Sequence, residues 1–359
     1  MSERNVKPGD VLKADWSKLN WLLGGVFAAT MLLPLVVLSA LDLEVYWLSV
    51  WFGVFFVGLS DPGGDLATRC AHVSLFAAIG ALFTAWGIWV GGEGWGLVAA
   101  SAFVVVLGSG LALHFGVRRF VTGTLLGAWF LIAISLPPGF AAAGVTLDPA
   151  RQALAWLVGA ALWLVVSSVV WSAARRSVPQ PPLVAELPAD TTAVAITRPM
   201  VAYAVIRAVV VGGAVAIAFG LDLPYADWMP IAALIAMKTS LQQSTLAAVQ
   251  RVVGTVLGAG IAIVVLLGVS NLHVIGVAVL ACALVGGALR TVNYALYTMA
   301  VAAAALIALD IADPTDLATE GQRILFTLLG VVLAVGVTIL AGMLKHDATE
   351  QSAPEQRPS

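Results

Sequence analysis

The sequence of 359 residues has few charges and almost no cysteine. Charged residues make up 11% of it, hydrophobic residues make up 60%, and the mean hydropathy is +0.98. Soluble globular domains carry about 25% charged residues, so this scarcity excludes an ordinary soluble protein and indicates an integral membrane protein. The two cysteines, Cys70 and Cys282, suggest no disulfide framework.

Motifs for chemistry are missing as well. The chain contains no Gly-x-x-x-x-Gly-Lys-Ser/Thr phosphate loop, which argues against direct use of ATP. It shows no metal-ligand spacing and no clustered nucleophile and base, which a membrane-embedded enzyme such as a lipid-modifying transferase would need. We therefore expect neither an enzyme nor a cofactor, metal or nucleic-acid partner.

Long apolar runs rich in Ala, Leu, Val and Gly fill most of the chain. A spanning helix needs ~20 apolar residues, whereas the strands of a membrane barrel would be shorter and alternating. We predict an all-α integral membrane protein with about twelve transmembrane helices. The predicted spans are 19–40, 44–60, 71–91, 94–116, 120–139, 152–174, 201–221, 226–238, 249–269, 272–289, 292–309 and 323–344.

The distribution of Lys and Arg tests this count, because cations gather on the cytoplasmic side of a membrane protein. With twelve spans, nearly all cations fall at even-numbered junctions or at the termini, and only Arg151 and Arg323 fall on the other side. The opposite face is acidic. We therefore predict a multi-pass protein of the bacterial inner membrane with both termini in the cytoplasm.

A proline-rich polar stretch at 175–200 interrupts the apolar pattern, a composition typical of a linker. It divides the chain into a cytoplasmic segment 1–18, a first six-helix repeat 19–174, the linker, a second six-helix repeat 201–345 and a cytoplasmic tail 346–359. An even number of spans in each half makes the repeats parallel. The motifs LDLEVYW and LDLPYADW, which follow the first span of each half, support this repeat.

The second span of each half is short, and interrupted segments at matching positions of two repeats point to a substrate path. Asp61-Pro62-Gly63-Gly64-Asp65 interrupts the first half, and the polar stretch 238–245 interrupts the second. Proline and glycine do not continue a helix comfortably. The other interpretation is an ordinary cytoplasmic loop beside a tilted helix.

One stretch of the second half resembles a known family. It is YADWMPIAALIAMKTSLQQSTLAAVQRVVGTVLGAGIAIVV, and it is similar to the core motif of the fusaric acid resistance (FUSC), or aromatic acid exporter, proteins. The matching features are Tyr225 and Trp228, the short apolar span, the polar Thr/Ser/Gln turn, and Gln250-Arg251 followed by Gly254, Thr255 and Gly258. Arg207 and Arg290 with Asn293-Tyr294 are similar to flanking family features, and GLSDPGG with Arg69 is a weaker match in the first half.

The resemblance implies an inner-membrane exporter of aromatic or related organic acids, distantly similar to plant malate channels. An organic anion crossing hydrocarbon needs cations or amides to replace its lost water. The substrate-binding candidates are Asp61, Arg69, Arg207, Trp228, Lys238, Gln242, Gln243, Thr245, Arg251, Asn293 and Tyr294.

Each cationic candidate also has a structural interpretation. Arg207, about two turns into its span, could snorkel to the interface. Lys238 and Arg251 satisfy the positive-inside rule without any substrate. Trp51 and Trp228 would normally anchor the outer interface, or they could stack on an aromatic substrate.

Two further patterns concern packing and coupling. Gly254-x-x-x-Gly258 is typical of helices that approach closely. All 20 carboxylates fall in loops or at span ends, which argues against a proton relay in the middle of the membrane.

Three alternatives to a carrier of organic acids stay open. One is an anion channel of the malate-channel type. Another is a major facilitator, whose usual Gly-x-x-x-Asp-Arg loop is matched poorly by Gly58 to Pro62. The third is a scaffold subunit without transport. The expected partners are a small organic anion, the lipid bilayer and, in a homo-oligomer, further copies of the chain.

Overall fold

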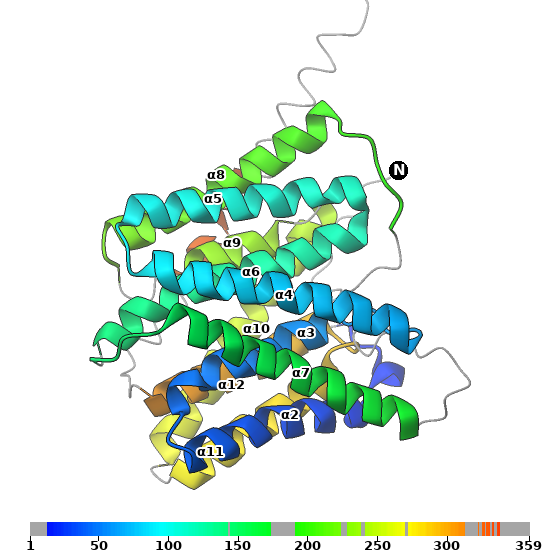
Figure 1. Cartoon of the computed structure of the whole chain (residues 1–359), viewed down its shortest axis with the longest axis vertical. Coiled ribbons are helices and arrows are strands. Elements are labelled where there is room, and N and C mark those ends of the chain that lie inside the picture. The colour runs from blue at the N-terminus through cyan, green and yellow to red at the C-terminus, as the bar shows by residue number, and fades with distance from the viewer. Residues whose placement is uncertain are drawn as a thin grey trace, which may run out of the picture.

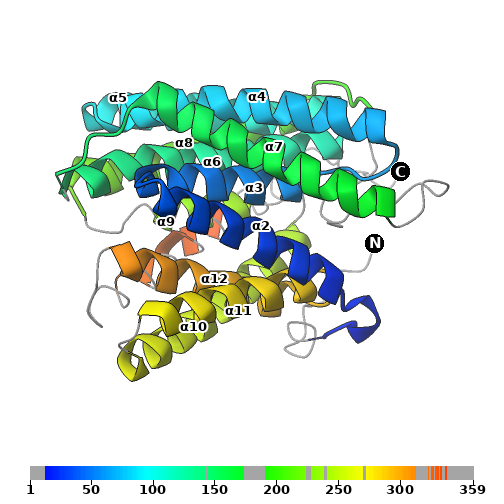
Figure 2. The same ribbon diagram turned by 60° about the horizontal axis from the view of Figure 1, so that its bottom comes forward.

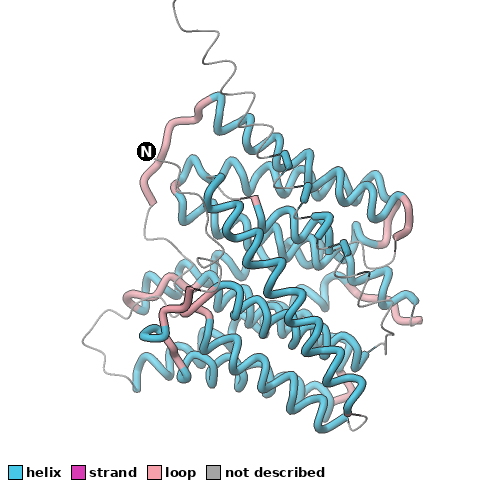
Figure 3. Tube along the Cα trace, turned by 180° about the vertical axis from the view of Figure 1, so that it is seen from behind, coloured by secondary structure: helices cyan, strands magenta, loops and turns pink. Residues whose placement is uncertain are grey.

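The computed structural model describes residues 13–142, 144–173, 191–223, 228–237, 241–269 and 272–312, with short stretches between 322 and 337. In this part of the chain all regular structure is helical, and no strand occurs (Figures 1 and 3). The prediction of an all-α protein is therefore confirmed for the described residues.

Each long helix coincides with a predicted apolar span. The helices are α2 (Trp21–Ala40), α3 (Trp47–Ser60), α4 (Leu66–Gly91), α5 (Trp95–Leu111), α6 (Val117–Ala142), α7 (Pro149–Ala173), α8 (Arg198–Gly220), α9 (Trp228–Ala236), α10 (Leu241–Gly268), α11 (Leu272–Leu289) and α12 (Tyr294–Ala312). Short 3-10 helices η1 (Trp16–Lys18), η2 (Glu44–Tyr46) and η3 (Ala112–Phe115) precede or follow them.

Within the described residues, six helical segments are long and apolar enough to cross a membrane. They correspond to α2, α4, α5, α6, α7 and α8, while shorter apolar segments lie in α3, α10, α11 and α12. The count of twelve spans stays a prediction, because the twelfth, 323–344, falls mostly outside the described residues.

One predicted boundary is wrong. We expected the polar stretch 238–245 to interrupt the helices, but α10 begins at Leu241. Gln242, Gln243 and Thr245 therefore belong to the first turns of a helix, not to a turn between helices. Their amide and hydroxyl side chains gave them the composition of a loop, although glutamine is a good helix former.

Several helix contacts come in matching pairs, both within and between the two halves. Contacts join α5 to α8 and α11 to α2, α4 to α6 and α10 to α12, and α2 to α3 and α8 to α9. Figure 1 shows α5 beside α8 at one end of the molecule and α2 beside α11 at the other. Figure 2 shows α10, α11 and α12 together on one side of the bundle.

The turns after α2 and α8 have the same geometry. Asp42 and Asp222, the central residues of the two LDL motifs, have positive φ angles of 55° and 48°, the only such non-glycine residues described. The next residues, Leu43 and Leu223, donate backbone hydrogen bonds to Leu38 O (2.9 Å) and Ala218 O (3.0 Å). Such left-handed turns end helices by satisfying their last carbonyls.

Small residues bring α2 close to α11 and α8 close to α5. A Cβ added to Gly287 would lie 2.9 Å from Gly24 Cα, and one added to Gly110 would lie 2.8 Å from Ala204 Cβ. The predicted close packing at Gly254 and Gly258 is confirmed, since a Cβ at either would lie 2.5 Å from a carbonyl oxygen of α12.

Three tryptophans form the buried centre of the first half. Trp129, Trp156 and Trp163 are each 0% exposed. The indole nitrogen of Trp129 donates to Thr84 Oγ1 at 2.9 Å, and that of Trp156 donates to Ala77 O at 3.1 Å. Because both N–H groups have partners, burial of these large rings leaves no polar penalty there.

The segment before α2 lies along the turn between α11 and α12. Asp15 N donates to Val292 O at 3.1 Å, and Asn20 N donates to Ala288 O at 3.2 Å. Thr291 Oγ1 donates to Lys18 O at 2.8 Å. These bonds join the start of the chain to the second half.

Candidate functional site

Arg207 of α8 is completely buried between helices of both halves. Its Nη1 donates to Ser109 Oγ at 3.0 Å, and its Nη2 donates to Thr124 Oγ1 at 2.9 Å and Leu234 O at 3.3 Å. The guanidinium also lies over the Phe120 ring, 4.9 Å from its centroid. The interpretation that Arg207 snorkels to the interface is wrong, because the side chain is 0% exposed.

The charge of Arg207 is not neutralised within the described residues. The ion pairs found there join other residues, and Arg207 Nε has no hydrogen-bond partner. Burial of an unpaired charge is costly unless a dense set of hydrogen bonds replaces its hydration. Arg207 is therefore a fixed positive charge between the two halves.

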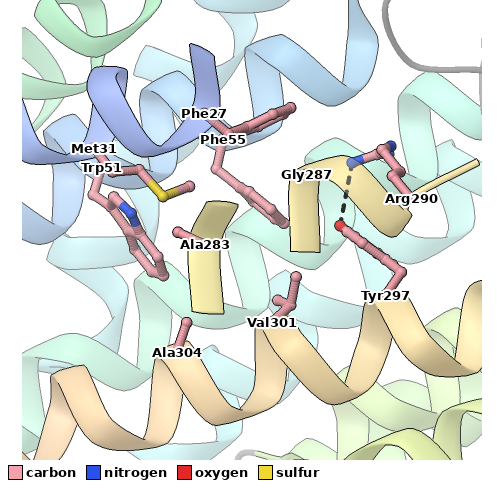
Figure 4. A pocket seen from close by; sticks show the side chains of 10 residues that line it. All are labelled: Phe27, Met31, Trp51, Phe55, Ala283, Gly287, Arg290, Tyr297, Val301 and Ala304. Atoms are coloured by element: carbon pink, nitrogen blue, oxygen red, sulfur yellow. Dashed lines mark hydrogen bonds between the residues drawn. The ribbon is translucent and has the colours of Figure 1, made fainter. Parts of the chain in front are cut away.

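A second buried guanidinium, Arg290, borders a pocket (Figure 4). The pocket lies between α2 and α3 of the first half and α11 and α12 of the second, and its cavity volume is ≈ 20 Å³, room for about one water molecule. Its described lining is Phe27, Met31, Trp51, Phe55, Ala283, Gly287, Arg290, Tyr297, Val301 and Ala304.

Arg290 and Tyr297 form the polar end of this pocket. Arg290 Nη1 donates to the Tyr297 hydroxyl at 3.2 Å, and its guanidinium lies 4.9 Å from the centre of that ring. Both side chains are at least nine-tenths buried. A guanidinium in such an environment binds a carboxylate strongly, because little water competes.

Aromatic rings form the other walls. The rings of Trp51 and Phe55 are stacked with centroids 6.2 Å apart, and Phe27 meets Phe55 edge-on at 6.4 Å. The expectation that Trp51 anchors the outer interface is wrong, since it is 6% exposed and faces the pocket. The chemistry of this lining suits an apolar ring with one carboxylate, but the cavity as it stands is too small to hold such a molecule.

Asp61 and Arg69, two further predicted residues, bind each other. Arg69 Nε donates to Asp61 Oδ1 at 3.0 Å and Nη2 donates to Oδ2 at 2.6 Å. The Trp163 indole and the Gly63 backbone add hydrogen bonds of 3.1 and 2.9 Å to the same carboxylate. Each carboxylate oxygen thus accepts two hydrogen bonds, and Asp61 is 0% exposed. The ion pair therefore holds α3, α4 and α7 together.

Asp65, at the other end of the same loop, caps α4. Its Oδ1 accepts a hydrogen bond of 2.9 Å from Thr68 N. Hydrogen bonds with Thr68 lower the pKa of this exposed carboxyl below its usual value; the bond with the side chain has the larger effect and the bond with the backbone the smaller.

Asn293 and Tyr294 lie at the start of α12. Asn293 Oδ1 accepts from Ala295 N at 2.7 Å and Leu296 N at 3.1 Å, as a helix cap does. Its amide donates to Lys13 O at 3.1 Å. The Tyr294 ring lies 6.2 Å from that of Tyr297, so these residues support the polar end of the pocket from outside its lining.

The remaining predicted residues belong to α9 and α10. Trp228 is the first residue of α9 and is partly buried. Lys238 lies outside the described residues, as do the side chains of Gln242, Gln243, Thr245 and Arg251. The cluster predicted from these residues stays a prediction.

Sequence reasoning missed most of the pocket lining. Phe27, Met31, Phe55, Tyr297 and Val301 lie within apolar spans and carry no distinguishing pattern. The available signal was Arg290, a cation shortly before Tyr294 and Tyr297, which the resemblance gives as a flanking family feature and not as a binding residue. Among the described residues no group of three His, Cys, Asp or Glu could hold a metal ion.

Comparison with known families supports a role in membrane transport. Residues 213–337 match the family model described as fusaric acid resistance protein-like. The resemblance drawn from the sequence is thereby confirmed for this part of the chain, which contains α9 to α12 and Arg290. No curated protein and no solved structure matches the chain.

Proposed function

From the family match and the pocket together, we propose that this protein exports small organic acids, chiefly aromatic carboxylic acids, across the bacterial inner membrane. The observation that supports this most directly is the pocket between the two halves, with Arg290 at one end and aromatic rings along its walls. In a conformation with α2 and α3 further from α11 and α12 than here, the guanidinium would bind the carboxylate, and Trp51 and Phe55 would contact the ring.

Arg207 would assist as a fixed charge. It lies between the halves, as the pocket does, and has no carboxylate partner among the described residues. A buried positive charge raises the affinity of nearby space for anions because the surrounding dielectric constant is low. Lys238, Arg251 and the polar start of α10 would collect substrate from the cytoplasm.

We propose a topology of two parallel six-helix repeats with cytoplasmic termini. The recurring helix pairs and the matching turns at Asp42 and Asp222 favour a repeat. The segment at 13–20 lies against the junction at 288–293, and Val194 N, after the linker, donates to His114 O at 2.9 Å. In both places, two segments that the sequence predicts to be cytoplasmic contact each other. Cations at these junctions favour the cytoplasmic side.

Export of an anion is energetically favourable in this orientation. A cytoplasm-negative potential drives one negative charge outward with ~2.3 kcal/mol per 100 mV. The full use of the Asp61 oxygens by Arg69, Trp163 and Gly63 argues against Asp61 as a proton carrier. An electrogenic carrier or a malate-type channel therefore fits better than a proton-coupled exporter.

Growth of a deletion strain on a panel of aromatic acids, at neutral and acidic pH, tests the function. We expect greater sensitivity of the deletion strain, restored by the wild-type gene and not by Arg290→Gln. Unchanged sensitivity across the panel would contradict export and favour a scaffold. In reconstituted vesicles, collapse of the voltage should slow efflux, whereas collapse of the pH gradient alone should leave it unchanged.

A further inference from the structure

The second short span, α9, is a helix too short to cross a membrane, and protein encloses it. It has nine residues and is therefore about 14 Å long, less than half of a hydrocarbon core of about 30 Å. Seven of these nine residues are buried. Its counterpart in the first half, α3, begins at the equivalent tryptophan, Trp47 against Trp228, and has 14 residues. With nine residues against 14, α9 ends five residues earlier than α3 does.

Helix α8 binds the carboxyl end of α9 through two side chains. Arg207 Nη2 donates to Leu234 O at 3.3 Å, and the Tyr203 hydroxyl donates to Met237 O at 3.1 Å. The last carbonyls of a helix have no partner within it, and a carbonyl buried without a partner is costly. Because Leu234 and Met237 are only 0% and 2% exposed, these two bonds stabilise the end of α9 in a place that water does not reach.

Arg207 also brings a positive charge to this end of α9. The carboxyl end of a helix carries up to about half a negative charge. The ion pairs among the described residues do not include Arg207, so α9 compensates part of a charge that no carboxylate there compensates. Phe120 lies against both side chains of α8, with its ring 4.9 Å from the Arg207 guanidinium and 6.3 Å from the Tyr203 ring.

The first half lacks both polar side chains at the equivalent positions. Counted back from the two LDL motifs, Leu23 is equivalent to Tyr203, and Phe27 is equivalent to Arg207. Both apolar residues are buried, at 1% and 3% exposed. In that half α3 continues for five more residues, so no helix end at this depth needs a partner. The tyrosine and the arginine thus occur in the half whose short span ends early.

We propose that Tyr203 and Arg207 are positioning residues that hold the end of α9 in the arrangement transport requires, an inference that rests on the proposed export function. The second short span is one of the two interrupted segments expected along the substrate path. Tyr203 is uncharged and lies outside the described pocket lining. Loss of its hydroxyl should therefore change the rate of efflux and leave the affinity for benzoate unchanged.

Reaction of a thiol at position 237 with a water-soluble maleimide tests this hold directly. The protein is the full chain with Met237→Cys, in a background of Cys70→Ala and Cys282→Ala that removes the other two thiols. Because position 237 is buried, its thiol reacts only when the end of α9 opens locally. Loss of one hydrogen bond in Tyr203→Phe should speed the reaction about two- to tenfold, and Arg207→Met should speed it about tenfold.

Two controls separate local from general loosening. Tyr46→Phe removes the hydroxyl of another partly buried tyrosine, in η2, which contacts α2, α3 and α7, and it should leave position 237 slow to react. A thiol introduced by Val54→Cys, at a 0% exposed position of α3, should stay unreactive in every variant. If Arg207→Met does not fold, Arg207→Lys keeps the charge, and Tyr203→Phe still decides. An unchanged reaction at position 237 in Tyr203→Phe and in the Arg207 variant would overturn the proposal.

Benzoate efflux from proteoliposomes tests the consequence for transport. Tyr203→Phe should lower the maximal rate severalfold and leave the benzoate concentration for half-maximal efflux unchanged. A faster maleimide reaction at position 237 together with wild-type efflux would overturn the positioning role. Absence of efflux from the wild-type protein would instead overturn the proposed function and the role in transport with it, while the maleimide reaction would still show whether α8 holds the end of α9.

Discussion

Arg69 and Asp61 form a buried ion pair in which two guanidinium nitrogens donate to the two carboxylate oxygens, at 3.0 and 2.6 Å. The Trp163 indole of α7 donates to the same carboxylate at 3.1 Å. The pair therefore joins the end of α3, the start of α4 and the middle of α7, three of the six α-helices described in the first half.

Removal of one charge from this pair should destabilise the protein strongly. Asp61→Asn leaves Arg69 buried without a counterion, and loss of one partner of a buried pair typically costs about 3–5 kcal/mol. Thermal unfolding in detergent measures the effect. The double variant Asp61→Asn/Arg69→Met should recover part of the loss; a single variant as stable as wild type would show that the pair contributes little.

Close packing of α3 on α7 should be equally sensitive at one glycine. A Cβ at Gly159 would overlap Val50 O, so Gly159→Ala must push these helices apart and should cost about 1–3 kcal/mol. Gly213→Ala, in α8, is the matched control, because nothing lies within 4 Å of its Cβ position. If both variants unfold at the same temperature, the contact between α3 and α7 has room for a methyl group at position 159, contrary to the structure.

Replacement of Arg207 by methionine should affect transport, which depends on the charge, more than stability, which depends on packing. In Arg207→Met the two hydroxyls keep their own partners, since Ser109 donates to Val106 O and Thr124 donates to Phe120 O, both at 2.8 Å. We therefore expect stability within about 1.5 kcal/mol of wild type.

Transport by Arg207→Met should nevertheless fall. Arg207 bonds to residues of α5, α6 and α9, whereas the pocket is lined by α2, α3, α11 and α12, so its charge acts on the anion from a distance and should change the affinity by a few-fold, less than a direct ion pair would. The expected result is a similar rise in the benzoate concentration for half-maximal efflux. Unchanged efflux from a stable Arg207→Met protein would assign Arg207 a purely structural role.

The cap of α4 should depend on pH through Asp65. Its pKa is lowered below 3.8 in the folded protein, so the stabilisation is present above that value and is lost as pH falls through the folded pKa. Asp65→Asn keeps a capping oxygen without a titrating group, and should flatten the fall in unfolding temperature below about pH 4. An identical acid profile in the variant would show that other carboxylates control this range.

The sequence predicted the helices better than the site, for a physical reason. Apolar runs of spanning length must become helices in a membrane, and α2, α8 and α11 match their predicted spans within three residues. The helices are apolar all round, however, so hydropathy does not indicate which faces meet. The pocket depends on that choice, because Phe27 and Val301 face it from helices in opposite halves of the chain.

Burial of charge was the other feature that composition could not predict. Arg69 and Arg207 both fit a rule that places cations at the cytoplasmic ends of helices. Both are buried instead: Ser109, which accepts a hydrogen bond from Arg207, and Trp163, which donates to the Asp61 partner of Arg69, lie far along the chain from the groups they bind. Such contacts arise from tertiary packing and leave no local pattern.

Efflux of labelled benzoate from proteoliposomes containing wild-type protein, Arg290→Lys or Arg290→Gln tests the pocket most directly. Charge-assisted hydrogen bonds contribute about 1.5–3 kcal/mol, so Arg290→Gln should raise the benzoate concentration for half-maximal efflux at least tenfold. For Arg290→Lys this concentration should lie between the values for wild-type protein and Arg290→Gln, because lysine keeps the charge but lacks the planar guanidinium that binds both carboxylate oxygens. Folded Arg290→Gln protein that exports benzoate as wild type does would contradict the account.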